Sequence, residues 1–311
     1  MHIAQIGVGR VGRPTAYTIM NSKLADTLTV CDTKPGLAAA FAEELRHVTA
    51  SLNIDVEICS CEKDEEVCNA DIILISAGEP RIAGIKMSRR DLATKNAKII
   101  KYVSEITASR NPCAKYIVIT NPVDTMAMVC KKYSKADFVI GTGTNLESLR
   151  FRSKLANNLQ VPNSNVQGWV GGEHGDAATP LWSTTRISNK PIDEYTTSEK
   201  QSLDKNEIES YIKQVSKFIV DNIGGTEYGP AASFRDITKA IVKNTNEIIP
   251  VATPVTLPEI PIPVFVGIPI HLGSNLGISL YNTLTEEEQL GIIEASKTIY
   301  RTYINAIENL C

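Results

Sequence analysis

The chain has 311 residues, of which 43% are hydrophobic and 22% are charged, a composition typical of globular proteins. Its net charge of −3 argues against a general nucleic-acid binder, which would carry a basic surplus. No apolar run approaches the roughly 18 residues that a membrane helix needs, and the first residues lack the pattern of a secretory signal. The sequence therefore predicts a cytoplasmic protein that binds neither nucleic acid nor membrane.

The first half of the chain alternates strand-length apolar runs with helix-length segments. This alternation indicates a parallel sheet covered by helices on both faces, and it predicts a first domain at residues 1–143. We expect strands at Ile3–Gly7, Leu28–Cys31, Val56–Cys59, Ile72–Ser76, Tyr116–Thr120 and Phe138–Ile140, and helices at Val11–Met20, Leu37–Val48, Asp91–Ser109 and Thr125–Lys132.

The second half, residues 144–311, has a mixed pattern that favours an α+β domain. Six prolines punctuate the stretch from Pro250 to Pro269. Because proline lacks the N–H that a central strand must donate, we expect an edge strand or an ordered loop there. Helices are expected at Asn145–Leu159, Ser198–Asn222, Ala231–Lys243 and Glu286–Asn309.

The seven cysteines are an odd number and show no metal-ligand spacing, so no metal site is predicted. Cys59 and Cys61 share one face of a predicted strand, and Cys68 follows them. We expect free thiols in a reducing compartment, with a disulfide as the alternative.

A glycine motif follows the first predicted strand and opens the first predicted helix. Gly7, Gly9 and Gly12 have the spacing of a dinucleotide-binding loop, in which the second glycine lets a pyrophosphate approach the backbone. Asp32 ends the second strand, where a carboxylate accepts hydrogen bonds from the ribose hydroxyls and repels a 2′-phosphate. The pattern predicts NAD rather than NADP. The predicted fold class is α/β, with an N-terminal doubly wound Rossmann sheet and a C-terminal α+β catalytic domain.

Among the four histidines, His174 is the candidate for proton transfer, because the glycines around it leave the ring accessible. Glu147 and Arg150 are three residues apart on a predicted helix and so project from one face. They suit holding a histidine ring and a substrate carboxylate, and a plain surface ion pair is the alternative. Asn121 follows a strand at the carboxyl end of the sheet, where its amide suits a substrate oxygen or a helix cap.

Four cations lie within ten residues after the Ile72–Ser76 strand: Arg81, Lys86, Arg89 and Arg90. With Gly84 as a pivot, this segment has the character of a lid that brings positive charge over an anion. A solvated basic loop is the alternative interpretation.

Together these motifs resemble the lactate/malate dehydrogenase family, in particular the archaeal-type malate dehydrogenases built on the lactate dehydrogenase plan. The similarity covers essentially the whole chain and extends to Leu146–Phe151, Gly172–Asp176 and Gly224–Pro230. It implies reversible hydride transfer between malate and oxaloacetate with NAD as the cofactor, with secondary activity on lactate and pyruvate. An L-lactate dehydrogenase is the alternative. The resemblance also implies a small dicarboxylate substrate and a homo-oligomer, a tetramer being favoured over a dimer.

The resemblance also assigns roles to the candidate residues. His174 would be the acid–base catalyst, and Glu147 would be its partner, where the family has an aspartate. Arg150 would bind the C1 carboxylate of the substrate. Arg89 and Asn121 would act at the substrate carbonyl oxygen.

The resemblance implies that Arg81 binds the distal end of the substrate. Because the interval from Arg81 to Arg89 is longer than is usual in the family, Lys86 is the alternative. Thr226 falls where the family lines the substrate pocket. The implied cofactor contacts are Gly7, Gly9, Arg10, Val11, Gly12, Asp32, Ala77, Gly78, Asn96, Thr120 and Asn121.

Two other function classes compete with this interpretation. An NAD-dependent glycosidase needs cysteine and histidine metal ligands near the cofactor, and the region of Asn121 has neither. A dinucleotide-sensing module without chemistry has no reason to combine His174, Arg150 and Arg89. NADH oxidation on addition of oxaloacetate, of pyruvate or of nothing distinguishes the three classes.

Overall fold

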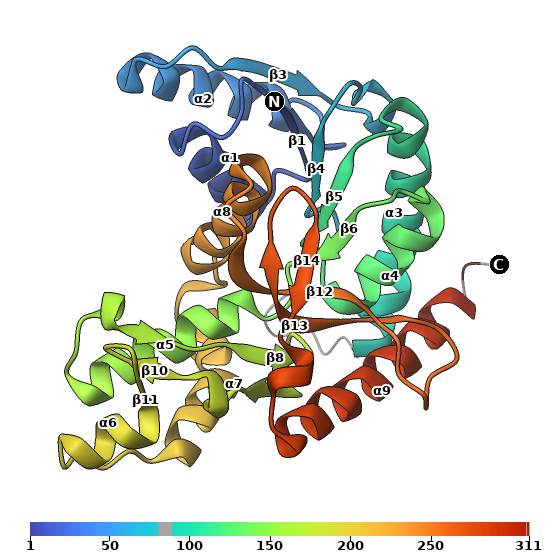
Figure 1. The fold of residues 1–311 in the computed structure, drawn as a ribbon. Coiled ribbons are helices and arrows are strands. Elements are labelled where there is room, and N and C mark those ends of the chain that lie inside the picture. The colour runs from blue at the N-terminus through green and yellow to red at the C-terminus, as the bar shows by residue number, and fades with distance from the viewer. Residues whose placement is uncertain (80–88, 309, 311) are drawn as a thin grey trace.

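One mixed sheet of 11 strands runs through the computed structural model, which describes residues 1–79, 89–308 and 310 (Figure 1). The strand order is β3-β2-β1-β4-β5-β6-β12-β13-β8-β9, and β14 pairs with β13. The first six strands in this order come from the first half of the chain and the others from the second half. The halves therefore share one sheet, and they meet where Ala252 of β12 pairs with Gly141 of β6.

The six strands of the first half are parallel, and their order is that of the Rossmann fold. Every residue of β4 is buried, as expected for a parallel sheet between two helical layers. The prediction of an N-terminal doubly wound sheet is confirmed. The strands are β1 His2–Ile6, β2 Thr27–Cys31, β3 Glu57–Cys61, β4 Ile72–Ile75, β5 Lys115–Val118 and β6 Val139–Gly141.

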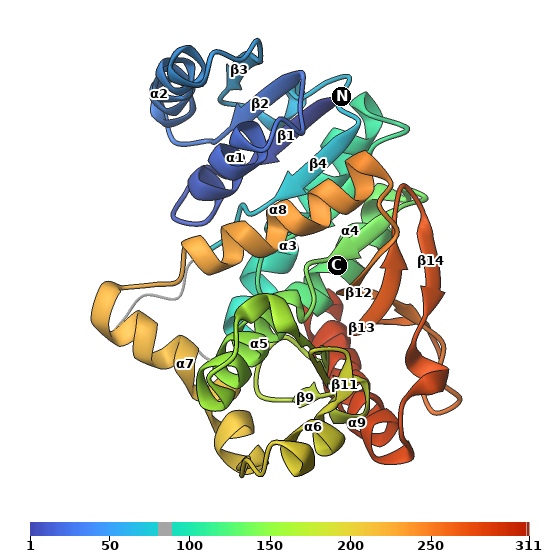
Figure 2. The ribbon, with the colours of Figure 1, turned by 60° about the vertical axis from the view of Figure 1, so that its left-hand side comes forward.

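Helices cover both faces of the parallel strands, with α1 and α2 on one side and α3 and α4 on the other (Figures 1 and 2). All four predicted helices are present. Helix α2 runs farther than predicted, to Leu52, and ends where Asn53 adopts the left-handed conformation (φ 51°). The bounds are α1 Gly12–Asn21, α2 Leu37–Leu52, α3 Arg89–Arg110 and α4 Val123–Ser134.

The proline-rich stretch forms long strands inside the sheet, so the prediction of an edge strand or loop is wrong. Strands β12 (Glu247–Val255) and β13 (Val264–Leu272) each have neighbours on both sides. Pro250 and Pro269 lie opposite each other in this antiparallel pair. The Pro269 carbonyl accepts a hydrogen bond from the Leu280 N–H (2.9 Å), so the backbone of Pro269 faces away from β12 and its missing N–H costs the β12–β13 ladder nothing.

The predicted helix Ser198–Asn222 also needs correction, because Ser198 ends one helix and a second helix begins only at Lys205. Asp204 caps the second, α7, by accepting hydrogen bonds from the N–H groups of Asn206 (2.9 Å) and Glu207 (3.1 Å). The remaining helices are α5 Asn145–Leu159, α6 Ile192–Ser198, α7 Lys205–Ile223, α8 Tyr228–Lys243 and α9 Glu286–Glu308. The remaining strands are β7 Val166–Gln167, β8 Val170–Gly172, β9 Ala178–Pro180, β10 Arg186–Ile187, β11 Lys190–Pro191 and β14 Leu276–Ser279.

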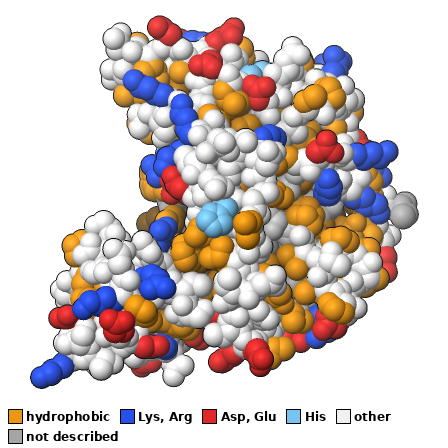
Figure 3. All heavy atoms as spheres, in the orientation of Figure 1, with side chains coloured by type: hydrophobic (Ala, Val, Ile, Leu, Met, Phe, Trp, Pro, Cys, Tyr) orange, Lys and Arg blue, Asp and Glu red, His pale blue; other side chains and the backbone are white. Residues whose placement is uncertain are grey.

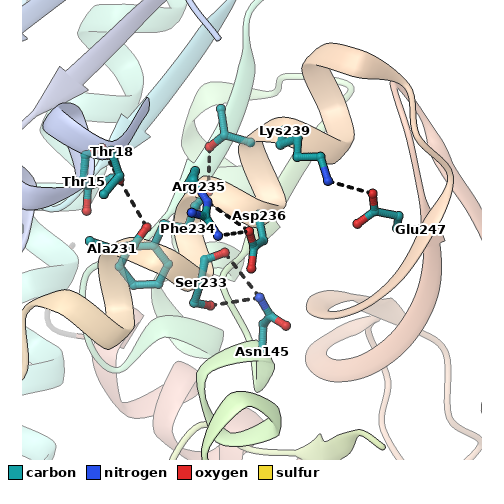
Figure 4. A network of polar contacts seen from close by, with 11 residues as sticks. Thr15, Thr18, Asn145, Ala231, Ser233, Phe234, Arg235, Asp236, Lys239 and Glu247 are labelled. Carbon is teal, nitrogen blue, oxygen red and sulfur yellow. Dashed lines mark hydrogen bonds and ion pairs between the residues drawn. The ribbon is translucent and has the colours of Figure 1, made fainter. Parts of the chain in front are cut away.

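Helix α8 fastens the second half of the chain to the first (Figure 4). The Thr18 hydroxyl of α1 donates to the Ala231 carbonyl of α8 at 3.3 Å. On α5, the Asn145 amide donates to the carbonyl and the hydroxyl of Ser233 at 3.2 and 3.0 Å, and both residues are buried. Helix α8 therefore holds the start of α5 at a fixed place relative to the helix that follows the glycine motif.

The cysteines in the described part of the chain are all free, as expected. Cys31 and Cys130 are buried, whereas Cys68 and Cys113 are exposed. None of the helices within the described residues combines the length and the apolar character that crossing a membrane requires.

Candidate functional site

The glycine motif lies in the turn from β1 to α1, and its glycines differ in what surrounds them. A Cβ on Gly7 (φ +85°) would lie 2.6 Å from the Ala77 nitrogen, and one on Gly12 would overlap the Gly7 carbonyl. Gly12 therefore lets α1 pack against the end of β1, and Gly7 lets this turn pack against the segment after β4. A Cβ on Gly9 would meet nothing within 4 Å. The backbone at Gly9 is thus open to a ligand, which fits the approach of a dinucleotide pyrophosphate.

Asp32 follows β2 and faces this loop. Its Oδ2 accepts a hydrogen bond from the Val8 N–H and its Oδ1 accepts one from the Lys34 N–H, both at 2.9 Å. The carboxylate thus has a fixed orientation beside the turn, and each oxygen keeps a second lone pair for a ligand hydroxyl. This geometry fits the ribose role that the sequence predicts for Asp32.

Arg10, predicted to contact the cofactor, reaches across to the second half of the chain. Its Nη1 donates to the Ile223 carbonyl (3.2 Å) and to Glu227 Oε1 (2.9 Å). A Cβ on Gly225 would lie 2.7 Å from the Arg10 Cδ, so this glycine makes room for the arginine. Sequence reasoning did not anticipate the contact with Glu227, because the two residues are more than 200 positions apart.

A second group of predicted residues gathers at the ends of β4 and β5. The Thr120 hydroxyl donates to the Ala77 carbonyl (2.7 Å), and a Cβ on Gly78 would lie 2.6 Å from the Thr120 Cγ2. The buried Asn96 accepts a hydrogen bond from the Glu79 N–H (2.8 Å) and donates to the Asn121 carbonyl (2.7 Å). Asn96 therefore ties the segment after β4 to the segment after β5. The Asn121 side chain itself is exposed.

Three of the predicted site residues, Glu147, Arg150 and His174, meet between α5 and the turn after β8. Glu147 Oε2 lies 3.1 Å from His174 Nδ1, and its Oε1 accepts a hydrogen bond from Arg150 Nη1 at 3.2 Å. The side chain of Glu147 is 4% exposed and that of His174 is 25% exposed. One buried carboxylate thus orients both the candidate acid–base group and the candidate carboxylate anchor. The spacing of three residues on α5 brings Arg150 back over Glu147, as predicted.

The charges in this cluster favour a protonated imidazole. Burial disfavours the cation, but the charge and hydrogen bond of Glu147 outweigh it, so the pKa of His174 lies above its usual value. Burial also acts to raise the pKa of Glu147, but His174 and then Arg150 reverse the effect, and the pKa of Glu147 is lowered. Each partner therefore favours the charged form of the other, imidazolium for His174 and carboxylate for Glu147.

Asp124 is a further residue of this cluster, and the sequence did not predict a role for it. It lies in the first turn of α4, and its Oδ2 accepts a hydrogen bond from the His174 N–H at 2.9 Å. The chain runs directly from Asn121 into α4, so Asp124 connects the Asn121 group with the His174 group. The signal that could have found it is an acidic residue just after the strand end that carries Asn121.

The other predicted site residues have separate positions. Val11 is the N-cap residue of α1, and Thr226 is half-buried in the connection between α7 and α8. Figure 3 shows a hollow on the left of the molecule, between the part with α1 and α2 and the part with α5 to α7, with basic side chains at its edge. Arg81 and Lys86 lie outside the described residues. Arg89 begins α3, and its side chain is also outside that description.

Two family models together match nearly the whole chain. Residues 1–138 match the NAD-binding domain of the lactate/malate dehydrogenases, and residues 144–309 match their alpha/beta C-terminal domain. The chain belongs to the lactate/malate dehydrogenase family. It is therefore an NAD-dependent oxidoreductase that acts on a small molecule with a CH–OH group, and the prediction of NAD is confirmed.

The similar proteins include both malate dehydrogenases and L-lactate dehydrogenases. A malate dehydrogenase of Sulfurisphaera tokodaii is 38% identical over 99% of this chain and 97% of its own length. An L-lactate dehydrogenase of Thermoanaerobacter is 30% identical over 98% of this chain and 99% of its own. The structure of a malate dehydrogenase of Plasmodium falciparum in complex with NADH superposes with a TM-score of 0.89, at 25% identity, over all of both chains.

Proposed function

We propose that the protein is an NAD-dependent malate dehydrogenase that reduces oxaloacetate reversibly to malate. The observation that carries this proposal is the contact of one buried carboxylate, Glu147, with both His174 and Arg150. This contact places a candidate proton donor, His174, next to a candidate anchor for an anionic substrate, Arg150. The 38% identity to the Sulfurisphaera tokodaii malate dehydrogenase favours oxaloacetate over other keto acids.

The orientation of His174 supports its role as the acid. Nδ1 faces Glu147, whereas Nε2 makes no hydrogen bond to any residue that the structure describes. The Nε2–H is therefore the proton that would pass to the substrate carbonyl oxygen on reduction and return on oxidation. Because Glu147 holds the other ring nitrogen, the ring keeps its orientation while its charge changes.

Arg150 would bind the C1 carboxylate of the substrate through the face of its guanidinium that Glu147 leaves free. The bound dinucleotide supplies the hydride. Gly9 and Asp32 would hold its pyrophosphate and ribose, with Gly7, Arg10, Val11 and Gly12 completing that loop. Asn121 and Arg89 would polarise the carbonyl. Ala77, Gly78, Asn96 and Thr120 would shape the nicotinamide side of the site.

This assignment divides the chain into a cofactor domain at 1–143 and a catalytic domain at 144–311. We further propose Arg81 as the partner of the distal carboxylate, with Lys86 as the second candidate and Thr226 lining the pocket. An arginine at the lid position favours a dicarboxylate, because a cation without its anion in a closed site is costly.

The second candidate function is that of an L-lactate dehydrogenase. The observation behind it is the 30% identity to the L-lactate dehydrogenase of Thermoanaerobacter. We expect oxaloacetate to be the better substrate, with measurable reduction of pyruvate at higher concentration, because the long interval between Arg81 and Arg89 gives Arg81 room to turn away.

One assay tests the proposal. NADH oxidation is followed by the loss of NADH absorbance with oxaloacetate, with pyruvate, or with no keto acid. A higher kcat/KM for oxaloacetate supports a malate dehydrogenase. A higher value for pyruvate supports a lactate dehydrogenase, and no oxidation with either would overturn both.

We also propose a cytoplasmic homotetramer. Exposed apolar side chains occur on α1, α7 and α8, where Tyr17 is 42%, Phe218 68% and Tyr228 78% exposed in the single chain. Faces of this kind are typical of surfaces that subunits cover. Sedimentation equilibrium gives the subunit number directly, and a monomer would contradict the proposal.

A further inference from the structure

Asp124 is a buried acid to which the proposed reaction gives no task. Its side chain is 2% exposed, and Oδ2 accepts the hydrogen bond from the His174 N–H. Its other oxygen, Oδ1, is buried and has no hydrogen-bond partner among the residues that the structure describes. A buried carboxyl oxygen without a partner costs stability. An asparagine could accept the same hydrogen bond from the His174 N–H, so this bond by itself does not call for a residue that carries charge.

The turn that carries His174 depends on this bond for its position. Gly172 ends β8 at φ +87°, and the Ala178 N–H returns to the Gly175 carbonyl at 3.3 Å. The tight turn from Gly172 to Ala178 sets the shape of the segment, but not its place against α4. The Asp124–His174 hydrogen bond provides that connection, while Glu147 holds the ring from α5. Backbone and ring of His174 are thus held from two different helices.

The charged groups that face Asp124 come from two further elements. Helix α5 contributes Glu147, and the turn after β8 contributes His174 and the buried Glu173, while Arg150 of α5 acts on His174 and Glu147. Burial raises the pKa of Asp124 to about 7, the charge of His174 acts against the rise, and Glu173 and Glu147 add to it. In return, the charge of Asp124 acts to raise the pKa of His174. The charge of each group therefore affects the proton affinity of the other.

We propose that Asp124 is a second acidic positioning residue for His174, which fixes the histidine backbone and helps to keep a proton on its ring. The proposal deepens the proposed function and rests on it, because a proton held on His174 matters only if His174 passes it to the substrate. The proton affinity of the catalytic histidine is then set by two carboxylates, from α4 and α5, instead of by Glu147 alone.

The test is Asp124→Asn, which keeps an oxygen to accept the His174 N–H and removes the charge. The ring of His174 is titrated by NMR in histidine-labelled protein, where four histidines give few signals and His174→Asn assigns the relevant one. We expect the proton affinity of His174 to fall by at least about threefold. The midpoint of the alkaline fall of kcat/KM for oxaloacetate should move to lower pH, to a proton concentration that is higher by the same factor. An unchanged titration and an unchanged profile would leave Asp124 a purely structural residue and overturn the proposal.

Two controls sharpen the result. Asp64→Asn also replaces a buried aspartate whose pKa burial raises, but it lies beside Cys31 and away from His174, so it should leave the His174 titration in place. Asp124→Ala removes both the charge and the hydrogen bond and should lower kcat further than Asp124→Asn does. Equal kcat values for the two variants would show that the hydrogen bond positions nothing.

The wild type provides a measurement that needs no variant to fold. With ¹³C-carboxyl aspartate, one signal should titrate near neutral pH, as the raised pKa of Asp124 requires, and its curve should follow that of the His174 ring. An Asp124 carboxyl that stayed protonated throughout this range would refute the proposal, because an uncharged group cannot favour the imidazolium. These titrations stand apart from turnover: if the wild type failed to reduce oxaloacetate, the proposed function would fail, and the coupling of Asp124 to His174 would still be decided by NMR.

Discussion

His174 and Glu147 come from different elements, and the 3.1 Å between Nδ1 and Oε2 joins the turn after β8 to the first turn of α5. The family resemblance implies an aspartate at the position of Glu147. The longer side chain reaches the ring here without losing its second contact, to Arg150 at 3.2 Å. The pair therefore forms despite the extra methylene, and it leads to the first prediction.

Two substitutions of Glu147 distinguish the effect of its charge from the effect of its side-chain length. Glu147→Gln removes the charge that favours the imidazolium, so turnover of oxaloacetate should fall by about 100-fold or more, and the alkaline limb should move to lower pH. Glu147→Asp keeps the charge and should fold and remain active. The pH–rate profile of both variants is the measurement. An unchanged profile in Glu147→Ala would show that Glu147 is not the partner of His174.

The pH dependence of the two directions should be opposite. Reduction needs the protonated ring of His174, and its pKa is raised above the usual 6.5 because Glu147 outweighs the effect of burial. The kcat/KM for oxaloacetate should therefore be high at low pH and fall only as the pH passes above 6.5. The kcat/KM for malate should rise over the same interval. Parallel profiles in the two directions would contradict the assignment of His174 as the shared acid and base.

The glycine motif allows a matched pair of substitutions. Gly12→Ala places a methyl group against the Gly7 carbonyl and should destabilise the protein by about 1–3 kcal/mol or more, measured by denaturant unfolding. Gly9→Ala meets nothing within 4 Å and should leave the stability unchanged. Its methyl would instead stand where the pyrophosphate approaches, so the Kd for NADH should rise. Equal NADH binding in Gly9→Ala and the wild type would show that the dinucleotide does not pass over Gly9.

Asp32 should set the preference for NADH over NADPH. Asp32→Asn retains an oxygen for the Val8 N–H but loses the charge that repels a 2′-phosphate, so kcat/KM with NADPH should rise by about tenfold. Asp32→Ala, the control, also loses the contact with the loop and should weaken both cofactors. A wild type that prefers NADPH would contradict the role given to Asp32.

The choice of substrate should depend on the cationic lid segment. Arg81→Gln should reduce kcat/KM for oxaloacetate by an amount that corresponds to roughly 2–4 kcal/mol of transition-state binding, and it should spare or raise the activity on pyruvate. Lys86→Ala is the matched comparison. If only Lys86→Ala reduced the activity on oxaloacetate, Lys86 would be the partner of the distal carboxylate, and if neither variant did, this segment would not set the choice of substrate.

Local sequence patterns predicted those features of the protein that depend on residues close together in the chain. Strands β1 to β6, the helices between them and the glycine motif all follow from apolar runs and spacing within about 30 residues. The pairing of Glu147 with Arg150 follows from one helical turn in the same way. The meeting of His174 with Glu147 was implied by the family resemblance, and spacing alone left a surface ion pair open.

The features that the sequence did not predict depend on contacts between distant segments. The missing N–H of Pro269 looks disruptive in isolation and becomes harmless only because Pro269 turns its backbone away from β12. The role of Asp124 depends on a turn 50 residues later, and that of Arg10 on Glu227 in the other half of the chain. Single-residue propensities contain no information about such partners.

The pairing of β6 with β12 restricts how this molecule can move. Because one sheet extends through both halves and α8 is bonded to α1, the halves cannot rotate about a hinge without breaking strand pairing. Any closing over the substrate must therefore come from loops. The same pairing implies that a fragment cut at residue 143 would expose the unprotected edge of β6, and such an edge invites association with other chains. Although its two halves have separate tasks, the protein is built to fold as a unit.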